Sequence, residues 1–220
     1  MRRSGTGELC AWWWSDPVPQ SRRFFGAVYV DRDTERRVAA AGFERVRTFW
    51  RMTAPVPDSP AAAVVGPPVP AGLAIVPATD TRVVHRLREG TFADHWEHVP
   101  EPHDVWLARK TSEPGYDASM SFVAEVDGEP VGFMICSRQM ADDDALYIST
   151  LGTPATYRRR GVATALLNHS VGVARDAGFG SVWLGVDSDI PTGAPSVYRR
   201  AGFTVLFAVN AWHRPLALDG

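Results

Sequence analysis

The stretch ALYISTLGTPATYRRRGVA, residues 145–163, is the most informative part of the chain. Its beginning is mostly apolar and β-branched, which predicts a strand over 145–151. A Gly-Thr-Pro turn follows at 152–154, and residues 160–177 then carry apolar side chains at helical spacing until Gly178 interrupts the pattern. The segment therefore predicts a strand, a turn and a helix in immediate succession.

The start of this predicted helix has the features of a phosphate site. A helix N-terminus leaves several backbone N–H groups unpaired and carries partial positive charge, so it can bind a phosphate without side chains. Gly161 and Ala163 let a pyrophosphate approach the backbone closely, and Arg158, Arg159 and Arg160 add neutralising charge. The alternative is that the arginines only solvate an exposed helix start. Other common phosphate loops do not fit, because Gly-Lys-Ser/Thr is absent and no Gly-x-Gly-x-x-Gly follows a strand.

The sequence around this segment predicts strands and helices in a mixed order, which is typical of an α/β (α+β) fold. Asp127-Gly128 lies between two apolar runs and predicts a hairpin, and Asp80 is a candidate N-cap. The predicted strands are 73–76, 121–126, 130–137, 181–186 and 204–211, and the predicted helices are 80–92, 102–110 and 192–201.

A stretch rich in Pro, Ala, Val and Gly, residues 54–72, predicts a semi-rigid linker. It divides a partial N-terminal unit, 1–53, from a main domain, 73–220. The N-terminal unit predicts a strand at 24–31, a helix at 34–41 and a strand at 46–52. Two short motifs occur in both parts: Val30-Asp31-Arg32-Asp33 matches Val186-Asp187-Ser188-Asp189, and Ala41-Gly42-Phe43 matches Ala201-Gly202-Phe203. We interpret this as a duplication, with chance similarity as the alternative; the first copy has no counterpart of 150–163 and should lack its chemistry.

Composition excludes several classes of protein. The chain has 220 residues, 45% of them hydrophobic and 22% charged, with a net charge of −2, which is typical of a soluble globular protein and argues against nucleic-acid binding. Cys10 and Cys136 are too far apart for a disulfide framework or a zinc motif, and we expect Cys136 to be a core residue in a reducing cytoplasm. The apolar run at 12–14 is too short for a signal peptide or a membrane span. We expect a cytoplasmic protein without metal, membrane or nucleic-acid partners, and a homodimer is compatible with the sequence.

Two motifs carry a family resemblance. Arg158-x-x-Gly161-x-Ala163, between a strand and a helix, resembles the coenzyme A pyrophosphate motif of the GNAT acetyltransferase superfamily. The helix that closes with Tyr198-Arg199-Arg200-Ala201-Gly202-Phe203 is similar to a second signature of that family, a tyrosine followed four residues later by Gly-Phe. The resemblance covers about residues 72–215. Together with the repeat, it is similar to tandem GNAT proteins of the mycothiol synthase type, with a truncated first copy.

The resemblance implies a GNAT acyl-CoA N-acyltransferase fold, a mixed, mostly antiparallel sheet flanked by helices. It implies transfer of an acetyl group from acetyl-CoA, as co-substrate, to a primary amine of a small molecule or protein by direct attack in a ternary complex, without metal. Tyr198 would donate a proton to the departing thiolate. The residues implied to bind the coenzyme are Thr150, Leu151, Gly152 and Thr153 for the pantetheine arm and thioester, and Arg158, Arg159, Arg160, Gly161, Val162, Ala163 and Thr164 for the pyrophosphate.

Some features depart from the family pattern. The strand 145–151 has no carboxylate, so the base that deprotonates the amine is unassigned, and a coenzyme A-binding regulatory module without turnover is the alternative function. By simple alternation, Tyr147 and Ser149 are expected to share one face of that strand. Ile190-Pro191 stands where many relatives carry an asparagine. Three histidines, His95, His98 and His103, are expected at the surface, with the acceptor cleft as the alternative.

Overall fold

The computed structural model describes residues 22–27, 32–58, 68–93, 95, 98–188 and 193–215. Val30-Asp31 and Asp189 of the repeat, Ile190-Pro191 and Cys10 lie outside these ranges. The strands are β1 (Arg22–Ala27), β2 (Glu44–Pro55), β3 (Leu73–Pro77), β4 (Phe122–Val126), β5 (Glu129–Ser137), β6 (Ala145–Gly152), β7 (Ser181–Asp187) and β8 (Thr204–Pro215). The helices are α1 (Arg32–Ala40), α2 (Thr81–Phe92), α3 (His103–Thr111), α4 (Val162–Asp176) and α5 (Ala194–Arg200). None of the helices in the described part of the chain is long and apolar enough to span a membrane.

The strands form one eight-stranded sheet in the order β1-β8-β2-β7-β6-β5-β4-β3. Six of the neighbouring pairs are antiparallel and one, β6 with β7, is parallel. The mixed, mostly antiparallel sheet implied by the resemblance is therefore confirmed. Asp80 caps α2 by accepting a hydrogen bond from the backbone N–H of Arg82 at 2.8 Å, also as predicted.

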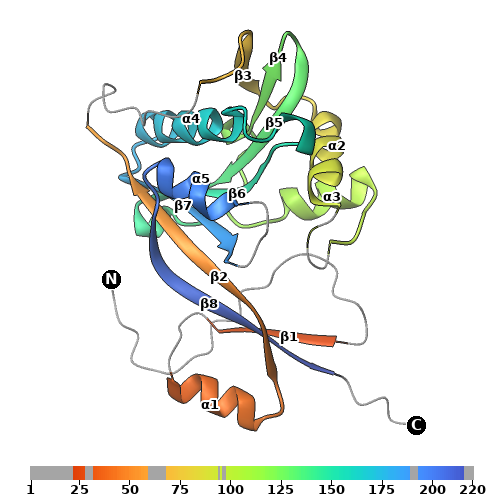
Figure 1. Cartoon of the computed structure of the whole chain (residues 1–220), viewed down its shortest axis with the longest axis vertical. Helices are drawn as coiled ribbons and strands as arrows, with labels where there is room; N and C mark the ends of the chain where they lie inside the picture. Colours follow the sequence, from red (N-terminus) through yellow and green to blue (C-terminus); the bar gives the residue numbers. More distant parts are fainter. Residues whose placement is uncertain are drawn as a thin grey trace.

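Helices cover both faces of the sheet (Figure 1). Along β5 the side chains alternate between the faces: Phe133 and Ile135 pack with α2 and α3, whereas Met134 and Cys136 pack on the side of α4 and α5. The buried partners on the first side include Val84, Leu87 and Trp106, and those on the second include Leu166, Leu167, Tyr198 and Phe203. Residues paired across neighbouring strands face the same side, so β5 shows which face each residue of β6 presents where the two strands pair.

The N-terminal strand β2 is built into the sheet of the main domain. It lies between β7 and β8, and β1 pairs with the other edge of β8. Both β2 and β8 are longer than predicted, because they pair with each other from Glu44 and His213 to Thr53 and Thr204 and form a long two-strand ribbon across the molecule (Figure 1). Met52 is completely buried in the main core. Strand β2 is thus part of the main domain's core, and it continues through Pro55 into the predicted linker.

The two strand-helix-strand units are related by an approximate two-fold arrangement. Phe49 of β2 pairs with Val209 of β8, and these two residues are separated in sequence by the same number of positions as Phe43 and Phe203 of the repeated motif. The outer strands correspond in the same way: β1 pairs with β8, β7 pairs with β2, and both pairs are antiparallel. This geometry is what a duplication would give, although duplication itself stays a prediction.

Candidate active site

The parallel strands β6 and β7 separate halfway along their length. They pair from Ala145 and Ser181 only as far as Ile148 and Leu184. On its other edge, β6 stays paired with β5 up to Gly152, with a register shift at Ser149. An extra residue in one strand bends it and increases its twist. The bulge at Ser149 therefore coincides with the point where β6 leaves β7, and residues 149–152 of β6 have no partner on β7; we call this place the opening between β6 and β7.

The same bulge interrupts the alternation of side chains along β6. Tyr147 pairs with Ser137 and Thr150 pairs with Ile135, two positions apart on β5, so Tyr147 and Thr150 face the same side of the sheet. Ser149 is the unpaired residue of the bulge, where simple alternation fails, so its sharing a face with Tyr147 stays a prediction. The Ser149 hydroxyl donates a hydrogen bond to the carbonyl oxygen of Ile135 at 3.2 Å. Leu151 points to the opposite side, where it packs against the main core.

The segment after β6 forms the open helix start that the sequence predicts. Gly161 is in the left-handed region, with φ 83°, and α4 begins at Val162, two residues later than expected. The first backbone bond across the helix start is from Ala165 N–H to Gly161 O, at 2.9 Å. The amides of Val162, Ala163 and Thr164 therefore precede the first helical hydrogen bond, which is the arrangement that binds anions at helix N-termini.

The three arginines before Gly161 have different roles. Arg158 is exposed, but its guanidinium is bound to the chain: it donates to the carbonyl oxygens of Thr153 at 3.2 Å and Thr91 at 3.4 Å. It therefore ties the end of α2 to the loop after β6. Arg159 and Arg160 are exposed, and the guanidinium of Arg160 lies 5.3 Å from the centroid of the Tyr157 ring. Of the three, Arg159 and Arg160 are placed to add positive charge near the helix start.

Two buried hydroxyl groups flank Gly152. Thr91 Oγ1 and Thr153 Oγ1 are buried and have no hydrogen-bond partner among the described residues. A Cβ on Gly152 would lie 2.4 Å from Phe133 Cε1 and 3.0 Å from Thr91 Cγ2, so only glycine fits there. Buried hydroxyl groups are normally satisfied, so each of these two has hydrogen-bonding capacity left for a ligand. Sequence reasoning missed Thr91 because it lies in an ordinary helix end outside any motif.

Tyr198 of α5 is buried in the main core. Its side chain is 9% exposed and belongs to the same cluster as Val162 at the start of α4 and Val186 at the end of β7. The centroids of the Tyr198 and Phe203 rings are 6.2 Å apart. Burial raises the pKa of the Tyr198 phenol from its usual value of 10.0 to about 12. The phenol therefore keeps its proton at neutral pH and can donate it.

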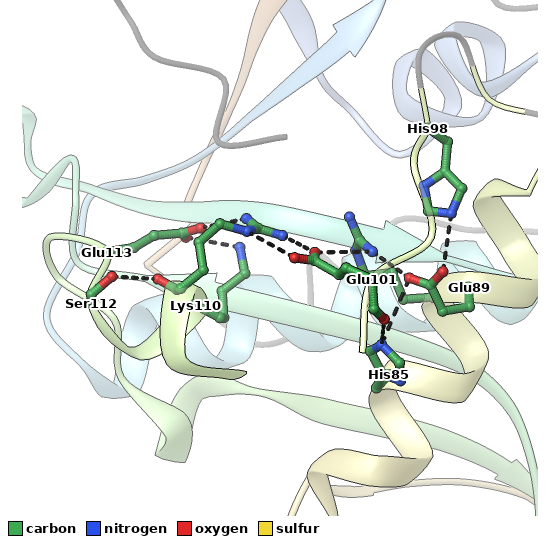
Figure 2. Close-up of polar contacts among 9 residues, drawn as sticks. His85, Glu89, His98, Glu101, Lys110, Ser112 and Glu113 are labelled. Carbon is green, nitrogen blue, oxygen red and sulfur yellow. Dashed lines mark hydrogen bonds and ion pairs between the residues drawn. The ribbon is translucent and has the colours of Figure 1, made fainter. Parts of the chain in front are cut away.

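A buried polar network joins α2, α3 and the segment between them (Figure 2). Glu101 is central: its carboxylate contacts the guanidinium of Arg109 and lies 3.6 Å from that of Arg88, and its carbonyl oxygen is 2.9 Å from His85 Nε2. Glu89 bonds Arg88 at 2.5 Å and lies 3.2 Å from His98 Nε2. The network fixes the position of α2, the helix that carries Thr91.

The histidines are less exposed than the sequence suggested. The His98 side chain is only 5% exposed because it contacts Glu89, so its prediction as a surface residue was wrong. His103 Nε2 lies 3.0 Å from Thr81 Oγ1, and the His95 ring packs 5.3 Å from the Phe92 ring. Both are partly buried. The sequence does not show which side chains contact a histidine, so it cannot distinguish a solvated histidine from one that contacts a carboxylate nine residues away.

The prediction that Cys136 is a core residue is confirmed. It is completely buried in the main cluster, and burial raises the pKa of its thiol well above the usual 9.0. We expect native protein to leave Cys136 unlabelled by iodoacetamide and urea-unfolded protein to label it, as located by peptide mass spectrometry. Labelling of Cys136 at equal rates in both conditions would contradict this burial.

Comparisons with known proteins agree with the fold and the motifs. The model of the acetyltransferase (GNAT) family matches residues 82–203. A mycothiol acetyltransferase of Thermomonospora curvata is 32% identical over 180 residues, which cover 80% of this chain and 58% of that protein. A streptothricin acetyltransferase of Streptomyces lavendulae is 32% identical over 121 residues, 54% of this chain and 63% of that protein.

A solved structure is similar over most of the fold. The GCN5-related N-acetyltransferase from Sphaerobacter thermophilus matches with a TM-score of 0.70 and 25% identity, covering 91% of this chain and 62% of its own. The chain spans little more than half the length of its mycothiol acetyltransferase relatives, 58% in T. curvata and 54% in Cellulomonas flavigena. Because the family model covers more than half of the chain and includes both motifs, this protein belongs to the acetyltransferase (GNAT) family.

Proposed function

We propose that the chain is an N-acetyltransferase that transfers the acetyl group of acetyl-CoA to a primary amine of a small molecule or peptide. The observation that carries the proposal is the opening between β6 and β7, which leads directly to the open helix start at Gly161. An extended thioester arm fits the first feature and a pyrophosphate the second. The names of two relatives, mycothiol acetyltransferase and streptothricin acetyltransferase, favour a small-molecule acceptor.

The coenzyme site would use backbone groups more than side chains. The amides of residues 161–164 would bind the pyrophosphate, with Arg159 and Arg160 lowering the local negative charge. The pantetheine arm would run along residues 150–153 of β6 and pair with the backbone edge that β7 leaves. The hydroxyls of Thr91 and Thr153 would bond the amides of that arm, which would satisfy two buried groups.

Direct attack explains why the site needs a proton donor. The neutral amine attacks the thioester carbon, a C–N bond forms, the C–S bond breaks, and the sulfur departs as a thiolate. Backbone N–H groups of the β6 edge would polarise the carbonyl oxygen. The Tyr198 phenol would protonate the thiolate, and the proton of the attacking amine would pass to solvent. The burial of Cys136 argues against an acetylated intermediate at this residue.

Calorimetric titration with acetyl-CoA tests the coenzyme site first. We expect binding by the unmodified chain and a loss of about tenfold or more in Gly161→Val, because the side chain strains a left-handed residue and crowds the pyrophosphate. The matched control is Gly178→Val at the far end of α4, where φ is also left-handed, at 80°, and a Cβ would meet nothing within 4 Å. Equal affinities in the two variants, or no binding at low salt by the unmodified chain, would contradict the site.

An assay of amine acetylation separates the enzyme from its alternative. We expect release of free coenzyme A thiol when acetyl-CoA is mixed with a suitable primary amine. The absence of a carboxylate from β6 favours a second candidate, a coenzyme A-binding module without turnover. Tight binding of acetyl-CoA without transfer to any member of a broad amine panel would support that second candidate.

A further inference from the structure

Arg51 of β2 reaches the opening between β6 and β7. It pairs with Gly185 of β7, which directly follows Leu184, the last β7 residue paired with β6. The guanidinium carbon of Arg51 lies 4.6 Å from the centroid of the Tyr147 ring on β6. The N-terminal strand therefore brings a cation to the edge of the proposed reaction site, although the main domain alone contains both coenzyme motifs.

Gly185 leaves space beneath the two side chains. A Cβ on Gly185 would lie 3.5 Å from Tyr147 Oη and 3.8 Å from Arg51 Nη1. Those two polar atoms therefore converge over the one residue of β7 that has no side chain. They lie on the same face of the sheet as Thr150, since Tyr147 and Thr150 face the same side. A ligand on this face can touch both donors and the β6 edge together.

The charges nearby favour an anion. Asp187, the next β7 residue on this face, is buried and lies 3.5 Å from Arg47, so its charge is opposed by a second arginine. A guanidinium stacked on an aromatic ring keeps its plane fixed and presents N–H donors at its edge. The Tyr147 hydroxyl adds another donor beside them. Two adjacent donors of this kind match the two oxygens of a carboxylate.

From this arrangement we propose that Arg51 and Tyr147 form the acceptor subsite for a carboxylate, so that the substrate is a primary amine with a carboxylate a few bonds away. The proposal rests on the proposed acetyltransferase function and specifies its acceptor. The amine and the carboxylate should be close together because Gly185, over which the subsite lies, is one residue past the last β6–β7 pair. A strand rises about 3.3 Å per residue. The subsite also gives the N-terminal unit a role: β2 completes the acceptor site.

Matched acceptors test the subsite in the unmodified chain. The panel contains amino acids and dipeptides, each paired with its C-terminal amide, which keeps the amine and removes the negative charge. With saturating acetyl-CoA, we expect kcat/KM to be about 10–100-fold higher for the acids than for the amides, as for the loss of a charged hydrogen-bond partner. Equal values for acids and amides would overturn the subsite and leave the acetyltransferase function intact.

Variants of β2 identify the residue responsible. Arg51→Gln is expected to raise KM about 10–100-fold for the acids and to leave the amides unchanged, with Arg51→Lys between the two. Arg45→Gln is the matched control, because it removes the same charge from an exposed position of the same strand. Equal losses for acids and amides in Arg51→Gln would show a structural role and overturn the proposal. No transfer to any amine would overturn the proposed function, and the subsite with it.

Discussion

Tyr198→Phe is expected to lower kcat about 10²–10⁴-fold, the usual contribution of a general acid. The change removes only the phenolic oxygen, and the ring keeps its place against Phe203 in the core. Affinity for acetyl-CoA should stay within about twofold, because the proposed coenzyme contacts come from β6 and the start of α4, whereas proton donation matters only when the thiolate leaves. Initial rates of thiol release at saturating substrates, together with calorimetric titration of acetyl-CoA, measure the two effects separately.

A second tyrosine supplies the control for this experiment. Tyr116, after α3, is also partly buried, and its pKa is raised by burial first and by the nearby carboxylates of Asp117 and Glu113. Tyr116→Phe removes the same atom outside the proposed site and should leave kcat unchanged. An unchanged kcat in Tyr198→Phe, in protein that still acetylates amines, would exclude Tyr198 as the proton donor.

Burial of Tyr198 should also be visible in the pH dependence of stability. Because the pKa in the folded protein is about 12 and that in the unfolded chain is near its usual 10.0, the stabilising effect is complete below pH 10. It is lost as pH rises from 10 to 12, since the unfolded state releases the proton first. Urea unfolding should therefore show a steeper loss of stability over this range in the unmodified chain than in Tyr198→Phe. Parallel curves would show that the phenol is not buried.

The strand, turn and helix start of the proposed coenzyme site were predictable because their physics is local. A strand, a turn and a helix start follow one another within residues 145–163, and the left-handed Gly161 lies where the motif requires a glycine. The family and the mixed sheet followed from the two motifs in order, and both are confirmed. The bulge at Ser149 was not predictable, since it exists only in the pairing of β6 with β5.

Contacts between distant segments account for most of what the sequence did not show. The place of β2 between β7 and β8 depends on pairings across more than half of the chain, which periodicity within β2 cannot reveal. The convergence of Arg51 and Tyr147 over Gly185 has the same origin. The buried state of His98 and Glu101 likewise depends on the packing of α2 against α3, where opposite charges permit burial that composition alone argues against.

Glu101→Gln is expected to lower the free energy of unfolding by roughly 3 kcal/mol, because breaking a buried ion pair leaves its partners without compensation. The Glu101 side chain is 7% exposed, and it faces two guanidinium groups, those of Arg88 and Arg109. The amide keeps the size of the side chain but removes its charge. Urea unfolding followed by circular dichroism measures the change.

Glu44→Gln is the control, because it removes the same charge from a side chain that is 81% exposed and lies 3.8 Å from His213. Solvent screens such a pair, so the expected loss is below about 1 kcal/mol. The effect of Glu101→Gln should extend to the proposed coenzyme site, because the network positions α2. On that helix, the carbonyl oxygen of Thr91 accepts a hydrogen bond from Arg158. Glu101→Gln should therefore weaken acetyl-CoA binding in protein that is still folded, and Glu44→Gln should not. Equal effects of the two variants on stability would show that Glu101 contributes no more than an exposed carboxylate, and unchanged acetyl-CoA affinity in a destabilised Glu101→Gln would separate the network from the site.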